Sequence, residues 1–223
     1  CFGCGKAGNA FDFVEEKYGF SSKDDVYKKL SEITGVEINF PKHVRERFEK
    51  EQQESNINLK ALSVFHLYLK HKDNFEGKVL EQIQKYLTEE RGFTQESIDK
   101  FFIGFTTKDF FPLLKAHIPI ENLLKMKLAH TYENENGKKT TLPLFQNHIV
   151  FPLFENNHLK GFQGRSLEEN PKIKYLNTGS IKLWNIDSTR GQNEVHVFEG
   201  IPDGITADQL GFENSVAILG VNG

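Results

Sequence analysis

Residues 194–223, EVHVFEGIPDGITADQLGFENSVAILGVNG, limit the possible folds more than any other part of the sequence. They predict a strand over residues 195–198, a short helix that ends at Leu210, and a second buried strand over residues 215–219. Two apolar strands joined through a helix by short connections form a βαβ unit. Its strands should be parallel and its crossover right-handed.

Two acidic residues fall at the turn of this unit. Glu199 follows the first strand, and in open α/β sheets ligands collect just beyond the carboxyl ends of the strands. Pro202 suits the first position of the helix, so Asp203 lies in the first turn, where the helix dipole favours a negative charge. The two carboxylates should therefore face the same small volume, although simple helix capping is the alternative for Asp203.

Composition sets the outer limits. Thirty-one acidic residues against twenty-eight basic ones give a formal net charge of −3, so no global positive field indicates nucleic acid, although a basic groove can lie on a neutral protein. We find no apolar run long enough to span a bilayer and no secretory signal pattern. The chain is expected to be a soluble cytoplasmic protein without a membrane partner.

The chain begins with CFGCG, a Cys-x-x-Cys turn formed by Cys1 and Cys4, which are its only cysteines. Two thiolates on a tight turn suit one half of a tetrahedral zinc site, and the other two ligands are expected upstream of residue 1. A redox pair or an accidental pair is the alternative. A disulfide framework is not expected from two cysteines.

Helical patterns follow the cysteine turn. Asn9 can cap a helix that extends through Tyr18, and Ser22 can cap a second helix that Gly35 would end. Residues 41–58 are dominated by charge and glutamine, which predicts a solvated helix or a charged linker.

A second body begins at Leu59. Apolar residues recur at helical spacing through KVLEQIQKYL and ESIDKFFIG, and the many phenylalanines are interpreted as core. Beyond Met126 the period changes, and strands are predicted at residues 147–154, 159–166 and 174–176. Helices followed by strands indicate an α+β fold that leads into the βαβ unit.

Five segments in collinear order resemble the bacterial-type (DnaG-class) DNA primases. CFGCGKAGNAFDFVEEKYG resembles the closing half of the primase zinc ribbon, and YLTEERGFTQESIDKFFIGF resembles the helices that open the polymerase region. HIVFPLFENNHLKGFQGRSL resembles the family's GF-x-GR hairpin, and IKYLNTGSIKLWNID its KYLN segment. VFEGIPDGITADQLGFENSVAILG resembles the opening of the Toprim fold.

The resemblance implies an enzyme that makes short RNA primers on single-stranded DNA by metal-dependent nucleotidyl transfer. Glu199 matches the first Toprim glutamate, expected to be catalytic and to bind magnesium or manganese, and Asp203 matches the aspartate that shapes the same acidic cluster. Carboxylate oxygens are suitable magnesium ligands, and paired divalent ions neutralise phosphate charge during such transfers.

The resemblance also implies a groove for the template and the nucleotide. Arg165, Lys174 and Asn177 match the family's groove residues by position. Lys172 and Tyr175 lie beside them, and for these two a solvated lysine and a packing aromatic are equal alternatives. Arginine binds phosphate bidentately, lysine acts as a point charge, and aromatic rings stack on bases.

Several positions depart from the family pattern. Gln146 and His148 replace arginines, which weakens the expected basic ridge, and a hydrogen-bonded structural role is the favoured interpretation of His148. Trp184 and Asn185 replace the usual Tyr-Gly, and residues 220–222 replace a Gly-Thr. The sequence is therefore interpreted as a diverged member from a phage or another mobile element.

A complete Toprim site adds an Asp-x-Asp pair after a later strand, and that pair is not in this sequence. We therefore expect that this polypeptide alone does not synthesise primers, although the protein that contains it does.

The resulting domain prediction is the end of a zinc ribbon with trailing helices (1–40), a charged linker (41–58), a mixed helix and strand N-terminal primase subdomain (59–193) and the start of Toprim (194–223). Its expected partners are single-stranded DNA, ribonucleoside triphosphates and a replicative helicase. The alternatives are a non-catalytic primase-like protein that binds DNA or a helicase, and another Toprim enzyme such as a nuclease or topoisomerase.

Overall fold

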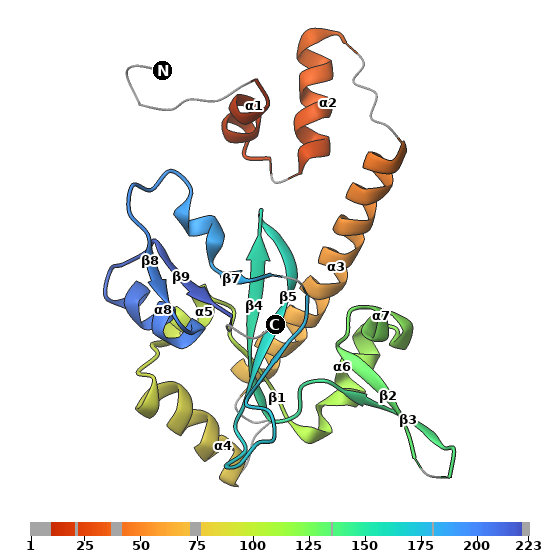
Figure 1. Ribbon diagram of the computed structural model, residues 1–223, viewed down its shortest axis with the longest axis vertical. Helices are drawn as coiled ribbons and strands as arrows, with labels where there is room; N and C mark the ends of the chain where they lie inside the picture. The colour runs from red at the N-terminus through yellow and green to blue at the C-terminus, as the bar shows by residue number, and fades with distance from the viewer. Residues whose placement is uncertain are drawn as a thin grey trace. The chain divides into compact units, whose positions relative to one another are not determined.

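A computed structural model describes residues 10–20, 22–36, 42–71, 77–134, 136–179 and 181–219 (Figure 1). The chain divides into two compact units. One contains residues 1–53 with 156–158, and the other contains residues 54–155 with 159–223. Cys1 and Cys4 lie outside the described residues, as do residues 220–222.

The smaller unit contains α1 (Ala10–Tyr18) and α2 (Lys23–Thr34). The Ser22 hydroxyl accepts a hydrogen bond from the Asp24 amide at 3.2 Å, and Gly35 ends the helix in the left-handed conformation with φ 67°. The caps predicted at Ser22 and Gly35 are confirmed, and Asn9, the cap predicted for the first helix, lies outside the described residues. Val14, Val26 and Leu30 are buried together between the two helices and form a small core.

The next helix, α3 (Lys42–Lys70), runs without interruption through the stretch expected to be a charged linker. An ion pair between Arg47 and Glu51, with Nε and Oε1 3.0 Å apart, has the i,i+4 spacing that supports a solvated helix. The expected boundary between residues 58 and 59 therefore falls inside a continuous helix.

The last residues of that expected linker are packed in the larger unit. The Ser55 hydroxyl accepts the amide N–H of Leu159 at 3.1 Å, and the Asn58 side chain donates to the Leu159 carbonyl at 3.0 Å. Both polar side chains are nearly inaccessible to solvent. The sequence predicted a linker here because these residues are polar. Their burial depends on hydrogen bonds to a distant strand, which the local sequence does not indicate.

The larger unit begins within α3 and continues as a mixture of helices and strands. Its further helical segments are α4 (Gly77–Gln84), the π-helix η2 (Lys85–Glu90), α5 (Gln95–Lys100), η3 (Lys108–Phe110), α6 (Phe111–His117), α7 (Ile120–Lys125), η4 (Ile186–Thr189) and α8 (Ile201–Gln209). Its strands are β1 (Gly104–Thr106), β2 (Ala129–Glu133), β3 (Lys139–Pro143), β4 (His148–Glu155), β5 (His158–Ser166), β6 (Tyr175–Asn177), β7 (Leu183–Trp184), β8 (His196–Phe198) and β9 (Ser215–Ile218).

The strands form sheets with the orders β1-β4-β5-β6, β2-β3 and β7-β9-β8. The predicted strands at residues 147–154, 159–166 and 174–176 correspond to β4, β5 and β6. Asn156 and Asn157 connect β4 to β5 with φ of 53° and 59°, which is the conformation of a two-residue hairpin turn. The β4–β5 hairpin is central, with α6, α7 and β2–β3 to one side and α8, β8 and β9 to the other (Figure 1).

Strand β4 is buried on both faces and separates two cores. Ile149, Phe151 and Leu153 contact a core that includes residues of α4, η2, α5 and α8. Val150 points to the opposite core, formed with α3, α6 and α7. This alternation follows from the two-residue period of a strand, and it gives the sheet a helical layer on each side. Phenylalanines fill both cores, as predicted.

The βαβ unit forms as the sequence predicts. Strands β8 and β9 pair in parallel, with Phe198 opposite Ala217, and α8 connects them. The helix begins at Ile201 after the Gly200 cap, so Pro202 stands at its second position, one residue later than expected. Strand β7 adds to the other side of β9 in the antiparallel direction.

The combined architecture is a mixed helix and strand α+β fold, as the sequence predicts. Among the described residues, no helix has the length and apolar character needed to cross a membrane.

Candidate active site

Polar side chains share one face of the β5–β6 pair. The register places Arg165 opposite Tyr175 and Gln163 opposite Asn177, and directly paired residues point to the same face of a sheet. The Gln163 amide donates to the Asn177 side-chain oxygen at 3.0 Å. The structure therefore brings together three residues singled out from the sequence, Arg165, Tyr175 and Asn177, and adds Gln163.

Arg165 lies against an aromatic ring contributed by a distant segment. Its guanidinium carbon is 4.5 Å from the ring centroid of Tyr86, within the range of a cation–π contact. Its Nη1 donates to the Ser166 carbonyl, while its Nε is buried without a hydrogen-bond partner among the described residues. The guanidinium is thus held in place by the Tyr86 ring and the backbone.

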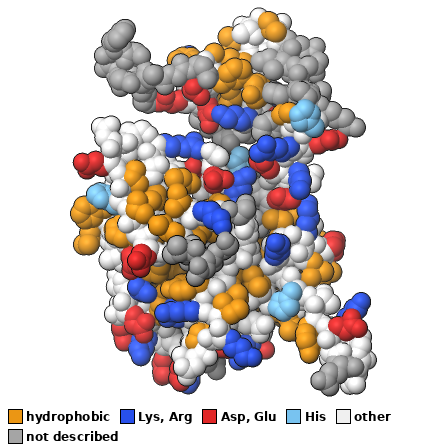
Figure 2. Space-filling model, in the orientation of Figure 1, with side chains coloured by type: hydrophobic (Ala, Val, Ile, Leu, Met, Phe, Trp, Pro, Cys, Tyr) orange, Lys and Arg blue, Asp and Glu red, His pale blue; other side chains and the backbone are white. Residues whose placement is uncertain are grey.

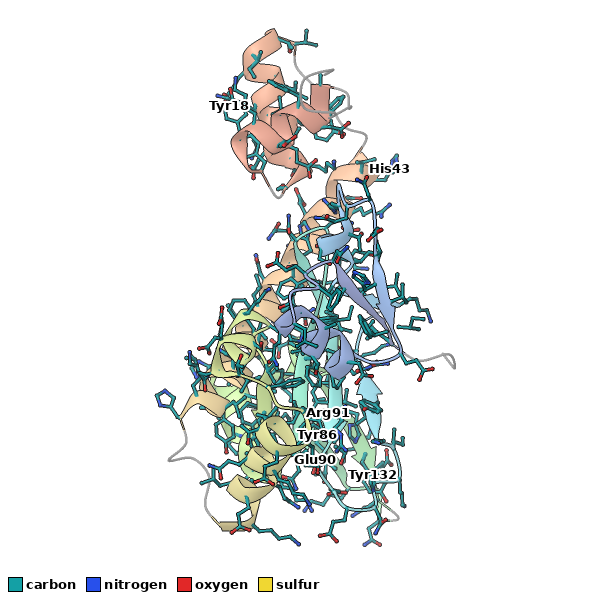
Figure 3. The ribbon with its side chains drawn as sticks, turned by 90° about the vertical axis from the view of Figure 1, so that its left-hand side faces the viewer. Tyr18, His43, Tyr86, Glu90, Arg91 and Tyr132 are labelled. Atoms are coloured by element: carbon teal, nitrogen blue, oxygen red, sulfur yellow. The ribbon has the colours of Figure 1, made fainter. Side chains whose placement is uncertain are left out.

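Tyr86 lies in the π-helix η2 and is only 2% exposed. Burial raises the pKa of its hydroxyl, and the nearby Arg91 and Arg165 cations oppose that rise. The Arg91 guanidinium carbon is 5.6 Å from the same ring centroid, so two arginines share one aromatic ring. Figure 3 labels Tyr86, Glu90 and Arg91 close together in the larger unit. Single π-helical turns occur frequently at functional sites.

Arg91 also reaches the acidic turn of the βαβ unit. Its Nη1 is 3.4 Å from Oδ1 of Asp203, in the first turn of α8. Glu199, which directly follows β8, is exposed at the same turn, and the Asp203 side chain is 56% exposed. Both predicted carboxylates therefore lie at the carboxyl end of β8, and one of them, Asp203, contacts Arg91.

Lys172 and Lys174 stand on the approach to β6. Both are exposed, and the Lys174 Nζ is 5.9 Å from the ring centroid of Tyr175. Asn177, at the far end of the strand, also donates from its side chain to the Leu219 carbonyl at 3.4 Å, just after β9. Strand β6 therefore connects the polar face of the β5–β6 pair to the βαβ unit.

A groove of about 530 Å³ opens beside Arg165 and Tyr86. Its remaining charged lining contains both signs but is mainly acidic, with Lys78 and Lys85 against the glutamates Glu81, Glu89, Glu90, Glu168 and Glu169. Figure 2 likewise shows Lys and Arg side chains interspersed with Asp and Glu on the face that it draws. Arg165 therefore borders a mainly acidic groove.

Gln146 and His148, which depart from the family pattern, are structural neighbours of the site. His148 is 7% exposed, and its Nδ1 lies 2.6 Å from the Gln146 carbonyl. Burial lowers its pKa and Arg165 lowers it further, whereas the Gln146 hydrogen bond and Glu168 act in the opposite direction. This buried, hydrogen-bonded position agrees with the structural interpretation of His148.

The donor atoms at the acidic turn suit a hard cation. Among the residues that the structure describes, no group of three or more His, Cys, Asp and Glu side chains is arranged to hold a metal ion. Glu199 and Asp203 nevertheless offer two carboxylates at one strand end, and magnesium commonly binds through one or two carboxylates while retaining waters. These residues fit one part of a magnesium or manganese site.

Sequence reasoning missed Tyr86, Arg91 and Gln163. Arg91 belongs to a segment whose resemblance to primases was noted, but it is 112 positions from Asp203, and only the tertiary fold brings the two side chains into contact. Tyr86 resembled an ordinary core residue because its spacing is helical. Gln163 is a buried polar residue whose partner lies on the next strand.

Comparison with known proteins identifies the fold. The structure is similar to the zinc-binding and RNA polymerase domains of the Aquifex aeolicus primase, with a TM-score of 0.59 and 22% identity, covering 99% of this chain and 53% of that one. It is also similar to a DNA primase domain from Pseudomonas aeruginosa, with a TM-score of 0.55 and 26% identity, covering 72% of this chain and 52% of that one. The fold is that of a primase catalytic core.

The sequence comparisons define the family. A family model described as the DNA primase catalytic core, N-terminal domain, matches residues 68–189. The DNA primase of Lactococcus lactis is 33% identical over 99% of this chain, and that of Enterococcus faecalis is 31% identical over all of it. The chain belongs to the DnaG-type DNA primases. It spans 35% and 38% of the length of these two relatives.

Proposed function

We propose that this chain is part of an enzyme that synthesises short RNA primers on single-stranded DNA. The observation that carries the proposal is the position of Arg91. Its guanidinium lies between the Asp203 carboxylate and the Tyr86 ring, against which Arg165 also lies. Phosphate-binding cations and metal-binding carboxylates are thus neighbours, as template-directed nucleotidyl transfer requires.

Each residue of the candidate active site has a proposed role. Arg165 and Lys174 bind phosphates of the template or the incoming ribonucleotide, with Lys172 as a more distant cation. Tyr175 stacks on a base, and Asn177 donates or accepts at a base or sugar edge. Arg91, which the sequence analysis did not select, is a further phosphate ligand because its guanidinium borders both sets of residues.

Glu199 and Asp203 are proposed to bind a magnesium or manganese ion. When bound, the divalent ion neutralises charge on the phosphates during transfer. The carboxylates hold and orient the ion, and Glu199 is the essential ligand because it follows the strand directly and is exposed. Pre-organised positioning and charge neutralisation account for most catalysis in phosphoryl transfer, so these side chains matter more than any proton-transfer group.

The finer domain assignment is also a proposal. Residues 194–223 begin a Toprim fold, supported by the parallel β8–β9 pair around α8. Residues 59–193 form the N-terminal primase subdomain, residues 41–58 precede it as a charged segment, and residues 1–40 close a zinc ribbon in which Cys1 and Cys4 ligate structural zinc. The two helices α1 and α2 would then trail the ribbon.

Single-stranded DNA and ribonucleoside triphosphates are the proposed ligands, with a replicative helicase as a partner in the bacterial cytoplasm. One protein of the same fold is described as the DnaG primase catalytic domain bound to single-stranded DNA. Another, from Mycobacterium tuberculosis, was solved with a double-stranded DNA that has a six-nucleotide overhang. Their identity to this chain is low, so they support the fold and only suggest the ligand.

The test is template-dependent RNA synthesis by the full-length protein that contains this chain. The reaction would contain labelled ribonucleotides, magnesium and a synthetic single-stranded template, with template-free and metal-free reactions as controls. Short RNA products that require both template and metal are expected. Binding of single-stranded DNA without any RNA synthesis would instead support a non-catalytic primase-like protein.

A further inference from the structure

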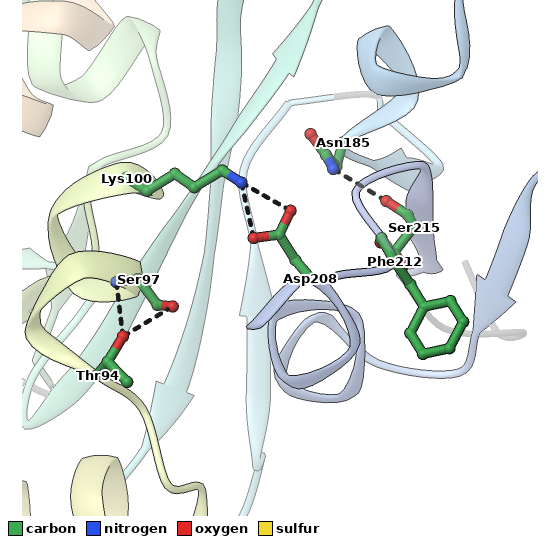
Figure 4. A network of polar contacts seen from close by, with 7 residues as sticks. All are labelled: Thr94, Ser97, Lys100, Asn185, Asp208, Phe212 and Ser215. Atoms are coloured by element: carbon green, nitrogen blue, oxygen red, sulfur yellow. Dashed lines mark hydrogen bonds and ion pairs between the residues drawn. The ribbon is translucent and has the colours of Figure 1, made fainter. Parts of the chain in front are cut away.

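One segment of the larger unit, residues 91–100, lies along α8. At its start, Arg91 contacts Asp203 in the first turn of the helix. At its end, the Lys100 Nζ donates to both carboxylate oxygens of Asp208 at 2.9 and 2.8 Å (Figure 4). We call these two contacts the entrance pair, Arg91–Asp203, and the anchor pair, Lys100–Asp208.

The two pairs have the same charges but different surroundings. In the anchor pair the Asp208 side chain is only 6% exposed, and the ammonium group bridges both of its oxygens. In the entrance pair the shortest contact is 3.4 Å, and the Asp203 side chain is 56% exposed. Solvent-exposed ion pairs contribute little to stability and exchange partners easily. A buried carboxylate that loses its cation is strongly disfavoured.

A side-chain amide at the last residue of α8 also fastens the segment to the helix. The Gln209 Oε1 accepts the backbone N–H of Thr94 at 2.9 Å, and its Nε2 donates to the Gly92 carbonyl at 3.1 Å. The segment is itself ordered, because the Thr94 hydroxyl caps α5 by accepting the Ser97 amide at 3.1 Å (Figure 4). The anchor pair and the amide therefore fix the last turn of α8 to a pre-formed structure.

The middle of α8 is fixed from another direction. A side chain at Gly204 would meet the Trp184 ring at 2.8 Å, so the absence of a side chain lets β7 approach the helix closely. The Trp184 ring is in turn 5.0 Å from that of Phe101, at the end of α5. The helix is thus held at its middle and its end, and fully buried Ile201 holds its first turn in the core, while the Asp203 side chain of that turn is exposed.

We propose that Lys100 and Asp208 are positioning residues that keep α8 docked while Asp203 exchanges Arg91 for a divalent cation. This inference rests on the proposed function. A carboxylate that binds a metal ion weakens its contact with an arginine, and Arg91 is then released toward the phosphates beside Arg165. Because the anchor pair does not take part in that exchange, the first turn stays in place when its own contact opens.

The exchange couples the two ligands of the proposed active site. An ion at Asp203 frees Arg91 for phosphate, and phosphate at Arg91 frees Asp203 for the ion. Such coupling is reciprocal by thermodynamic necessity. Loss of the anchor pair should therefore weaken metal binding and also the effect of nucleotide on metal binding.

The experiment measures manganese binding to the full-length protein in the absence of template, by the resonance signal of the free ion. Lys100→Met removes the anchor cation and keeps most of the side-chain volume. We expect binding weakened roughly tenfold, because a metal ligand displaced by about 1 Å loses much of its contribution. Lys100→Arg, which keeps the charge, should bind manganese nearly as the wild type does. Background from other sites is subtracted with Glu199→Gln.

The matched control is Lys125→Met, which removes another lysine ion pair, to Glu54 at 3.7 Å, on a different helix of the same unit. It should leave manganese binding unchanged. Thermal unfolding of each variant shows whether it folds. If Lys100→Met does not fold, Asp208→Asn, which keeps the shape of the side chain, is measured in its place.

Manganese affinity equal to that of the wild type in a folded anchor variant would overturn the inference, as would an equal loss in Lys125→Met. In primer synthesis, the anchor variants should raise the magnesium concentration needed for half-maximal rate more than they lower the maximal rate. If the wild type binds manganese but makes no primers, the proposed function fails, and the binding measurements still decide the role of the anchor pair.

Discussion

The two sides of the candidate active site are built differently. The β5–β6 face is pre-organised: Gln163 bonds to Asn177 across the strands, and Arg165 is held between the Tyr86 ring and a backbone carbonyl. The acidic side consists of exposed carboxylates at the end of a three-residue strand. The difference indicates that the side proposed to bind phosphate is pre-organised, whereas the side proposed to bind the metal depends on neighbouring segments for its position.

The physical basis is the depth of each element in the fold. Strand β5 pairs with β4, which lies between two buried cores, so β5 and β6 are supported by the packed centre of the unit. Strand β8 is at the edge of its sheet and is only partly buried. Its helix α8 buries Ile201 and Ile205 in the core and also contacts residues 91–100 and Trp184.

The largest effect is expected on the acidic side. Glu199→Gln keeps the size of the side chain but removes the charge that would bind the metal, so primer synthesis by the full-length protein should fall about a thousandfold or more, which corresponds to ~4 kcal/mol. Glu194→Gln, an exposed glutamate just before the same strand, is the control and should retain full activity. Synthesis at the wild-type rate by Glu199→Gln would remove this residue from the metal site.

The packing that supports the helix of the acidic side can be disrupted at Trp184. The indole is 3% exposed and packs against Gly204 and Phe101, so Trp184→Ala should lower the free energy of unfolding by about 3–5 kcal/mol through the cavity it leaves. Denaturant unfolding would measure the change. Leu210→Ala, at a 73% exposed position, should have little effect. A similar loss in both variants would argue against close packing of Trp184 on Gly204 and Phe101.

The pre-organised side is tested by Arg165→Lys. Lysine keeps the positive charge but loses the planar contact with Tyr86 and bidentate donation to phosphate, so affinity for a fluorescent nucleotide triphosphate should fall about tenfold, ~1.4 kcal/mol. Arg190→Lys, in an ion pair with Asp187 elsewhere in the unit, is the matched control. Unchanged affinity in Arg165→Lys would mean that charge alone accounts for binding on this face.

The smallest effect is expected beneath that face, at His148. Burial lowers its pKa below the ordinary value of 6.5, so the folded protein resists a proton that the unfolded chain accepts. The stability contribution is complete above the ordinary pKa and is lost as the pH falls below it, with a slope of at most about 1.4 kcal/mol for each pH unit.

Urea unfolding between about pH 7 and pH 5 would measure this dependence. The His148→Gln variant should lose less stability over that range than the wild type. His130→Gln, at an exposed position on β2, should keep the full wild-type dependence. If the two variants behave alike, His148 does not contribute to the pH dependence.

Much of the fold was predictable because local patterns and tertiary structure agree. The caps at Ser22 and Gly35, the β4–β5 turn and the parallel β8–β9 pair follow from turn chemistry and hydrophobic periodicity. Residues 54–58 differ from expectation because buried Ser55 and Asn58 hydrogen-bond to Leu159 of β5, a partner more than a hundred positions away that no local pattern reveals.

The amino-acid sequence was enough to predict the family and the α+β class and to single out most residues of the candidate active site, because these depend on short motifs and on the periodicity of apolar residues. The pairs of side chains that contact each other became known only from the tertiary structure. Arg91 contacts Asp203, Lys100 contacts Asp208, and Tyr86 supports Arg165, across separations of more than seventy positions. Such contacts depend on how helices and strands pack, and packing is a property of the whole chain rather than of any segment.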